Sequence, residues 1–233
     1  AASIDEALEQ PDEAMPRHRG ERTEGGVYEL TNLLAQGGMG RLFRAVDTVL
    51  ARDVALKVPR TRDPLLLWRF EREAAITARL QHPSIPPILT AGRFADGAPF
   101  YVMPIIDGQP LERAMAGAVT MPERLRLLGS LIAVCDAVGY AHAQRVVHRD
   151  LKPNNILVGG HAQTYVLDWG LAKRLPEATA PRTPRTPMRR RSWTSFGDTD
   201  APSGTADGGA TRHGEVVGTP GYMAPEQARG EVI

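Results

Sequence analysis

The sequence predicts an α+β fold, with a strand-rich first part and a mainly helical second part. Strand-like apolar runs occur at residues 28–34, 41–46, 54–58, 88–89 and 100–103. Apolar side chains at helical spacing occupy residues 65–80 and 122–143, and a shorter helix is expected at residues 111–116. The length of 233 residues suits one domain of two lobes or two small domains.

Composition and charge exclude several classes of protein. A net charge of +1 gives no reason to expect nucleic acid as a partner. The lone cysteine, Cys135, excludes an internal disulfide, which favours a reducing, cytoplasmic compartment. The sequence has neither a signal-peptide pattern nor an unbroken apolar run of the ~18 residues that a membrane span needs. We therefore expect no membrane contact within this chain.

Two segments have the composition of chain that cannot bury a core. Residues 1–26 are polar, with several prolines and glycines, and we expect a mobile leader. Residues 175–214 are rich in Pro, Thr, Ser, Gly and Arg, and we expect disorder there unless the segment is phosphorylated. The arginine run at residues 189–191 is expected to be solvated, with phosphate or partner binding as the alternative.

The longest predicted helix is expected to lie in the core. Its apolar stripe contains Leu128, Leu131, Cys135 and Val138, so we expect all four to be buried.

A polar loop followed by a hairpin is the most informative part of the sequence. The loop, residues 148–155, reads H-R-D-L-K-P-N-N, and the hairpin strands are predicted at residues 156–158 and 165–167. Gly159 and Gly160 begin the turn, where a positive φ is expected. Such a hairpin brings its two ends, with their polar side chains, close together.

The side chains at those ends indicate phosphoryl chemistry. Asn155 and Asp168 supply an amide and a carboxylate oxygen, which suit Mg²⁺ held between protein and phosphate. Asp150 can accept a proton from an incoming hydroxyl, and Lys152 can neutralise charge on a moving phosphoryl group.

The glycine-rich turn at residues 36–40 is a second candidate for phosphate binding. Gly37, Gly38 and Gly40 would let backbone N–H groups approach phosphate oxygens, but a hairpin turn without a ligand explains this loop alone equally well. Lys57 follows among the apolar residues of a strand, where a buried ammonium needs a partner. The alternative is a side chain that extends to water.

The first predicted helix carries a glutamate in its apolar stripe. This stripe consists of Leu66, Phe70, Glu73, Thr77 and Leu80. Glu71 falls on nearly the opposite face. A buried carboxylate needs a reason, and a local ion pair with Arg69, four residues earlier, is one explanation.

Three motifs in this order resemble those of the protein kinase family. They are the H-R-D-L-x-x-x-N loop, Asp168-Trp169-Gly170 in place of D-F-G, and Ala224-Pro225-Glu226. The position of Lys152 resembles the Ser/Thr branch, and residues 218–227 are most similar to bacterial Ser/Thr kinases. Trp169 departs from the usual Phe but is still a large ring that can pack under the metal-binding aspartate.

This resemblance implies a two-lobe fold. Residues 27–103 would form a first lobe of antiparallel sheet plus one helix, residues 104–108 a hinge, and residues 109–233 a mainly helical second lobe. Several more helices follow A-P-E in the family, so the chain looks like a fragment of the kinase domain.

The resemblance also implies binding of ATP and Mg²⁺. Asn155 and Asp168 would hold the metal, and Lys57, paired with Glu73, would reach the α- and β-phosphates. Pro104 C=O and Ile106 N–H would bind adenine between Ala55 and Leu157, with Met103 guarding the pocket behind it. The nucleotide-binding set is Leu34, Gly37, Gly38, Gly40, Leu42, Ala55, Lys57, Glu73, Met103, Pro104, Ile106 and Leu157. Ala35 stands where the family's first loop glycine would be, and Leu42 replaces its Val.

The function implied is an ATP-dependent protein serine/threonine kinase that acts on protein hydroxyls and on itself in trans. Asp150 would orient and deprotonate the hydroxyl, and Thr219 would hydrogen-bond Asp150 and Lys152. Rival interpretations are a nucleotide-binding pseudokinase and a scaffold fragment without turnover. Arg149 would pair with a phosphate in residues 175–214, preferably on Thr211, unless that segment is only a linker.

Overall fold

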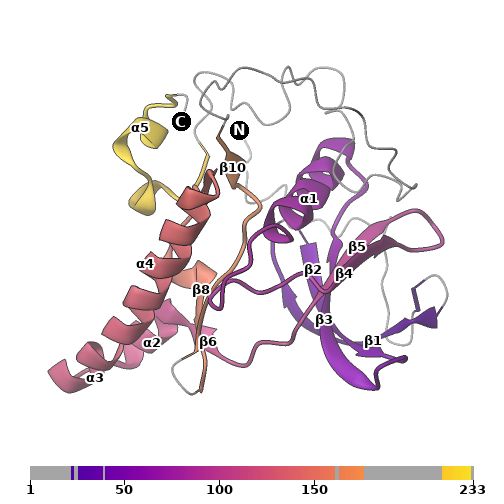
Figure 1. The fold of residues 1–233 in the computed structure, drawn as a ribbon, viewed down its shortest axis with the longest axis horizontal. Helices are drawn as coiled ribbons and strands as arrows, with labels where there is room; N and C mark the ends of the chain where they lie inside the picture. The colour runs from indigo at the N-terminus through magenta and orange to yellow at the C-terminus, as the bar shows by residue number, and fades with distance from the viewer. Residues whose placement is uncertain (1–21, 24–25, 39, 161–162, 176–216, 232–233) are drawn as a thin grey trace, which may run out of the picture. The chain divides into compact units, whose positions relative to one another are not determined.

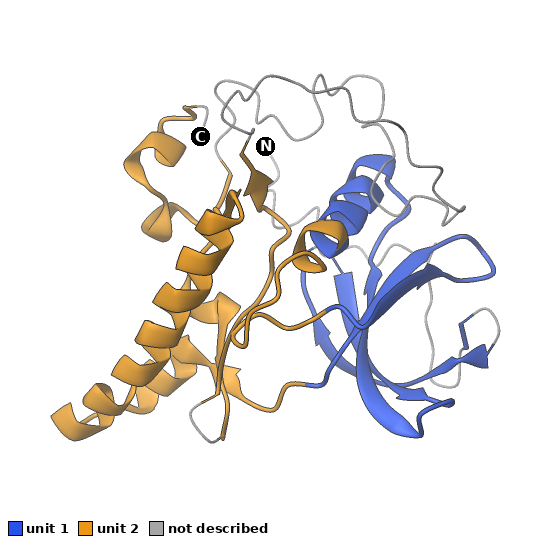
Figure 2. Ribbon diagram, viewed as in Figure 1, with its two compact units in different colours: residues 1–74, 88–105 blue, residues 75–87, 106–233 orange. Residues whose placement is uncertain are grey.

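The computed structural model describes residues 22–23, 26–38, 40–160, 163–175 and 217–231 (Figure 1). The chain divides into two compact units, one of residues 1–74 and 88–105 and the other of residues 75–87 and 106–233 (Figure 2). The division after Ile105 falls inside the segment expected to be a hinge. Most of the expected leader, and all of the expected insert after residue 175, lie outside the described residues, as does Thr211.

The first unit contains a five-stranded antiparallel sheet with strand order β1-β2-β3-β5-β4. Its strands are β1 (Tyr28–Gln36), β2 (Gly40–Asp47), β3 (Arg52–Pro59), β4 (Thr90–Arg93) and β5 (Pro99–Met103). Alternate residues of these strands point to one face, where Leu30, Phe43, Leu56 and Val102 form the buried core. The α+β prediction is thus confirmed for this part of the chain.

One predicted strand of this unit was misplaced. Residues 88–89 were expected to be extended, whereas the strand begins at Thr90 and ends at Arg93. Leu89 still donates its N–H to the carbonyl of Val102, 2.8 Å away, so it approaches the sheet without belonging to it. Pro86 and Pro87 lack the N–H that a ladder needs, which delays the strand.

Helix α1 (Pro64–Thr77) lies beside the sheet of the first unit (Figure 1). Asp63 caps it by accepting the N–H groups of Leu65 and Leu66 at 2.9 and 3.0 Å. Phe70 and Glu73 are buried, as the stripe predicted.

Glu71 lies on nearly the opposite face of α1 from that stripe. This side chain is also buried, because Arg93 of β4 reaches across and pairs with its carboxylate. The sequence pattern missed this because the partner comes from a distant strand.

The second unit combines short sheets with helices. Its helices are α2 (Leu111–Gly117), α3 (Met121–Arg126), α4 (Leu128–Ala143) and α5 (Pro225–Ala228). Its strands are β6 (Gln109–Pro110), β7 (Val146–Val147), β8 (Ile156–Val158), β9 (Thr164–Val166) and β10 (Lys173–Arg174). They pair as β6-β8-β9 and β10-β7. The core of this unit lies between α4 and these strands and includes Val134, Ala137, Ile156 and Val166.

The helix predicted at residues 122–143 is divided at Leu127 into α3 and α4. The face of α4 that was predicted to be buried is not the face that packs in the core. Ser130, Val134, Ala137 and Ala141 are the buried residues of α4, while Leu128 is 49% and Leu131 44% exposed. Cys135 is exposed, contrary to expectation. The buried stripe lies about 110° around the helix from the predicted one. The helix has two apolar faces, and the small-residue face packs on the strands.

The hairpin of β8 and β9 forms as predicted, but its glycines act differently. In the register of this hairpin Ile156 pairs with Val166. Neither Gly159 nor Gly160 has a positive φ. A Cβ on Gly159 would instead lie 2.6 Å from the carbonyl oxygen of Asp107, so close backbone approach is the reason for glycine there.

Among the described residues, the helical stretch Met121–Ala143 is long and apolar enough, by length and composition, to cross a membrane. The core helices of proteins without a membrane span can have the same length and composition.

Candidate active site

In the first unit, Lys57 of β3 forms an ion pair with Glu73 of α1. The ammonium Nζ lies 2.6 Å from Oε1 of Glu73, and the two side chains are 17% and 4% exposed. The carboxylate, rather than open water, is therefore the partner of this largely buried ammonium.

The glycine-rich turn leads directly into this region. Gly37 donates its N–H to the carbonyl of Gly40 at 2.9 Å, which closes the turn between β1 and β2. A Cβ on Gly40 would lie 2.6 Å from the carbonyl oxygen of Val58 and 3.4 Å from Cε of Lys57. Glycine is thus required at position 40 by close contact with β3, whereas nothing lies within 4 Å of a Cβ on Gly37 or Gly38.

The remaining nucleotide-binding candidates fall in both units. Ala55 is buried on β3 opposite Met103 of β5, and Leu42 lies opposite Lys57 on β2. Leu34, on β1, is 42% exposed. The other three are all partly buried: Pro104 in the first unit, and Ile106 and Leu157 in the second.

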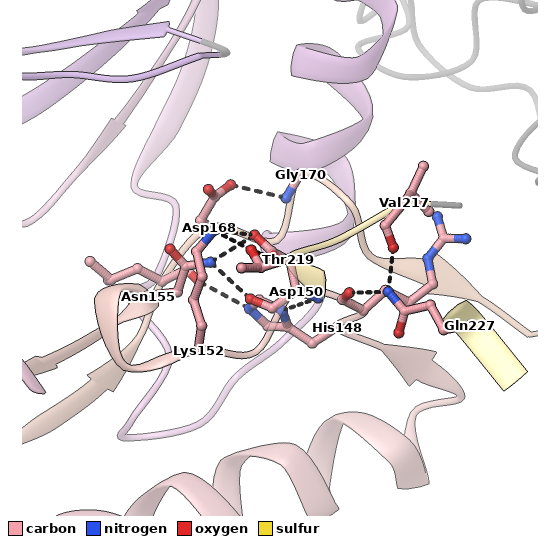
Figure 3. A network of polar contacts seen from close by, with 11 residues as sticks. His148, Asp150, Lys152, Asn155, Asp168, Gly170, Val217, Thr219 and Gln227 are labelled. Carbon is pink, nitrogen blue, oxygen red and sulfur yellow. Dashed lines mark hydrogen bonds and ion pairs between the residues drawn. The ribbon is translucent and has the colours of Figure 1, made fainter. Parts of the chain in front are cut away.

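In the second unit, a cluster of donors converges on Asp150 (Figure 3). Thr219 donates its hydroxyl to Oδ1 at 2.7 Å, and Lys152 Nζ lies 2.9 Å from Oδ2. Lys152 also donates to the Thr219 hydroxyl at 2.8 Å, so the three side chains form a closed triangle. Asn155 Nδ2 adds hydrogen bonds to the Asp150 carbonyl at 2.9 Å and to Oδ2 at 3.2 Å.

These contacts set the ionisation of Asp150. Burial acts to raise the pKa of this carboxyl, but the hydrogen bonds from Thr219, Lys152 and Asn155 and the charge of Lys152 outweigh it. The pKa of Asp150 therefore lies below its ordinary value, and the group is a carboxylate at neutral pH.

Asn155 and Asp168 stand at the two ends of the β8–β9 hairpin. Leu167, next to Asp168, donates its N–H to the Asn155 carbonyl at 2.8 Å, which ties the two ends together. Both side-chain hydrogen bonds of Asn155 use Nδ2, so the side-chain oxygen, Oδ1, is the atom suited to a metal. Asp168 has a φ of 59° and accepts the N–H of Gly170 at 3.4 Å.

This donor set fits Mg²⁺ shared with phosphate. One carboxylate and one amide oxygen leave most of the coordination positions to phosphate oxygens and water, as Mg²⁺ prefers. Within the described residues, no three His, Cys, Asp or Glu side chains gather in a way that could hold a metal by themselves.

His148 and Trp169 pack together and hold the loop of residues 148–155 in place. His148 Nδ1 accepts the N–H of Asp150 at 3.3 Å, and Nε2 lies 3.0 Å from the Leu167 carbonyl, which makes Nε2 the protonated nitrogen. The Trp169 ring is 2% exposed and its centroid is 4.6 Å from that of His148. The indole thus belongs to the core of the second unit and donates its N–H to the Val166 carbonyl at 3.3 Å.

Gln227 is a site residue that sequence reasoning missed. Its amide nitrogen donates to the Arg149 carbonyl at 2.6 Å and to the Val217 carbonyl, so one buried side chain joins the loop of residues 148–155 to the segment that carries Thr219. Gly218, at φ 121°, sits so close that a Cβ would lie 2.7 Å from the Arg149 carbonyl oxygen. An amide directly after A-P-E was the available signal, but nothing local shows which carbonyls it would reach.

Comparison with known proteins is consistent with this geometry. Residues 28–232 match the protein kinase domain family. The serine/threonine-protein kinase PknD of Protochlamydia amoebophila is 35% identical over 222 residues, which is 89% of this chain and 21% of that protein. PknB of Mycobacterium leprae is 32% identical over 212 residues, which is 88% of this chain and 29% of that protein. A probable serine/threonine-protein kinase of Streptomyces coelicolor is 35% identical over 219 residues, covering 91% of this chain and 28% of its own length.

The chain thus spans less than a third of each of these bacterial relatives. The family match, by contrast, covers almost the whole described chain. The chain belongs to the protein kinase family.

Proposed function

We propose that this chain carries the catalytic centre of an ATP-dependent protein serine/threonine kinase. The triangle of Asp150, Lys152 and Thr219 is the observation that carries this proposal, because it combines a hydroxyl-orienting carboxylate with a cation. The substrate hydroxyl oxygen would bond to the γ-phosphorus as the bond to the β,γ-bridging oxygen breaks. The hydroxyl proton would pass to Asp150, and ADP would leave.

In this proposal Asp150 both orients and deprotonates the hydroxyl, and orientation is the larger part of its role. Its lowered pKa makes it a weak base, so it holds the hydroxyl by accepting a hydrogen bond and takes the proton only as the O–P bond forms. Lys152, anchored between Asp150 and Thr219, would balance charge on the transferred phosphoryl group.

The nucleotide and metal roles rest on separate groups. Lys57, held by Glu73, would bind the α- and β-phosphates. Mg²⁺ on Asn155 and Asp168 would neutralise phosphate charge and fix its geometry. Protein substrates follow from the family. Phosphorylation of a second copy in trans is a further proposal, supported by the hydroxyl-rich segment at residues 175–214. A cytoplasmic location is another, supported by the lone cysteine.

The test is transfer from γ-labelled ATP to a generic protein acceptor, followed by identification of the labelled amino acid. We expect Mg²⁺-dependent labelling of serine and threonine, and its loss in Lys57→Ala. Binding of Mg·ADP without any transfer would favour the pseudokinase alternative. Labelling of tyrosine alone would contradict the serine/threonine assignment.

A further inference from the structure

Tyr101 makes a contact to the ion pair that its sequence position did not suggest. It lies on β5, directly opposite Lys57 in the register of the sheet, and is 3% exposed. Its hydroxyl donates to Oε1 of Glu73 at 2.7 Å. This is the same oxygen that lies 2.6 Å from Lys57 Nζ, so one carboxylate oxygen is bound by both donors.

The ring of Tyr101 is fixed from two sides. The ammonium of Lys57 lies 5.6 Å from the ring centroid, within the range of a cation–π contact. The Phe70 ring, one turn before Glu73 on α1, lies 5.1 Å from the Tyr101 ring centroid to centroid. The phenol therefore touches the strand lysine and two consecutive turns of the helix.

A lysine alone would hold Glu73 loosely, because the four-carbon stem of lysine has many rotamers. A phenol has only two side-chain torsions, and here packing fixes both. Burial raises the pKa of Tyr101 well above its ordinary value, with a further contribution from the charge of Glu73. The hydroxyl therefore remains a protonated donor throughout the physiological range.

We propose that Tyr101 is a positioning residue that locks the Glu73 carboxylate, and with it helix α1, in the arrangement that presents Lys57 to the nucleotide phosphates. This proposal rests on the proposed kinase function. The proposal adds an uncharged third group, the Tyr101 hydroxyl of β5, to the Lys57–Glu73 ion pair. The resting protein then holds Lys57 aligned before any ligand binds, so that less ordering is needed on binding.

The variant Tyr101→Phe removes only the hydroxyl. In the full chain we expect the dissociation constant of Mg·ADP and the KM for ATP to rise about tenfold, near the lower limit for a hydrogen bond to a charged group, with kcat changed less than KM. Tyr28→Phe is the matched control, because Tyr28 belongs to the same sheet but packs against Phe100. It should leave both constants unchanged.

A double-mutant cycle separates positioning from general packing. In a Glu73→Ala background, Tyr101→Phe should change the affinity for Mg·ADP by less than about twofold, because its acceptor is gone. The effects of Tyr101→Phe and Glu73→Ala on the free energy of unfolding should also be non-additive. Equal losses in both backgrounds, or an unchanged affinity in the single variant, would overturn the inference.

The two hypotheses fail differently. A wild-type chain that binds no Mg·ADP would overturn the proposed function. The unfolding cycle would still decide whether Tyr101 and Glu73 are coupled, and additive unfolding energies would overturn the positioning role by themselves.

Discussion

At Asp150, three side-chain donors converge on one buried carboxylate. The hydrogen bonds to its ionised form more than compensate for burial, which is why its pKa is lowered rather than raised. The folded chain therefore favours the ionised form more strongly than the unfolded chain does. Stability gained in this way is present above the unfolded pKa of about 3.9 and is lost as pH falls through the lower folded pKa.

Thr219→Val tests this linkage. Valine keeps the shape of threonine but removes the donor to Oδ1, so the pKa of Asp150 should rise and the free energy of unfolding at pH 7 should fall by on the order of 1–2 kcal/mol. The difference from wild type should shrink as pH falls from the raised folded pKa of the variant through the lower folded pKa of wild type, because only below the latter is the carboxyl protonated in both folded proteins. Urea unfolding of both proteins at several pH values measures this difference in the free energy of unfolding.

Thr164→Val is the control for that experiment. Thr164 is also buried, and among the described residues its hydroxyl has no hydrogen-bond partner. Thr164→Val should lower the free energy of unfolding only slightly. Its difference from wild type should be the same at every pH. A Thr219→Val penalty of the same size at pH 3 and pH 7 would contradict the lowered pKa of Asp150.

At the scale of elements, the turn between β1 and β2 uses its glycines unequally. Gly40 lies against the Val58 carbonyl, whereas a Cβ at Gly37 meets open space and Gly37 has no positive φ. Gly40→Ala should therefore lower the free energy of unfolding by about 1–3 kcal/mol through overpacking, and Gly37→Ala should change it by much less. Thermal unfolding of the two variants gives the comparison. Equal losses of unfolding free energy in the two variants would show that β2 can move away from β3 without loss of stability.

Strand β3 and helix α4 should also differ in local stability. Five of the eight residues of β3 are buried, and the strand is paired on both sides, so its amides are protected by a continuous ladder. Helix α4 has one buried face, and Leu128, Leu131 and Ile132 are exposed. Hydrogen exchange should be slow at residues 54–58 and faster at residues 127–138. The reverse order would contradict this account of the two elements.

At the scale of the whole molecule, the sequence predicted the groups whose chemistry is distinctive. Asp150, Lys152 and Asn155 were singled out as polar residues of one loop, and Thr219 followed from the resemblance to protein kinases. The structure brings all four together. A lysine and a glutamate in apolar patterns likewise drew attention, because buried charges need partners.

The sequence could not show what depends on distant partners. Tyr101 looked like any aromatic residue of a buried strand, and its hydroxyl gained a role only from Glu73 on α1. The burial of Glu71 did not follow from the helical pattern either, because its partner, Arg93, comes from β4. Helix α4 presented two apolar faces, and which of them packs on β7 and β9 is decided by tertiary contacts rather than by periodicity.

The most direct test of the central claim compares transfer and binding in one variant, Asp150→Asn. The amide has nearly the shape of the carboxylate but cannot take the hydroxyl proton and loses the charge that Lys152 and Thr219 bind. We predict that phosphoryl transfer to protein hydroxyls falls at least about 100-fold, while the dissociation constant of Mg·ADP stays within about twofold of wild type. Near-normal transfer by Asp150→Asn would contradict the assignment of this cluster as the catalytic centre.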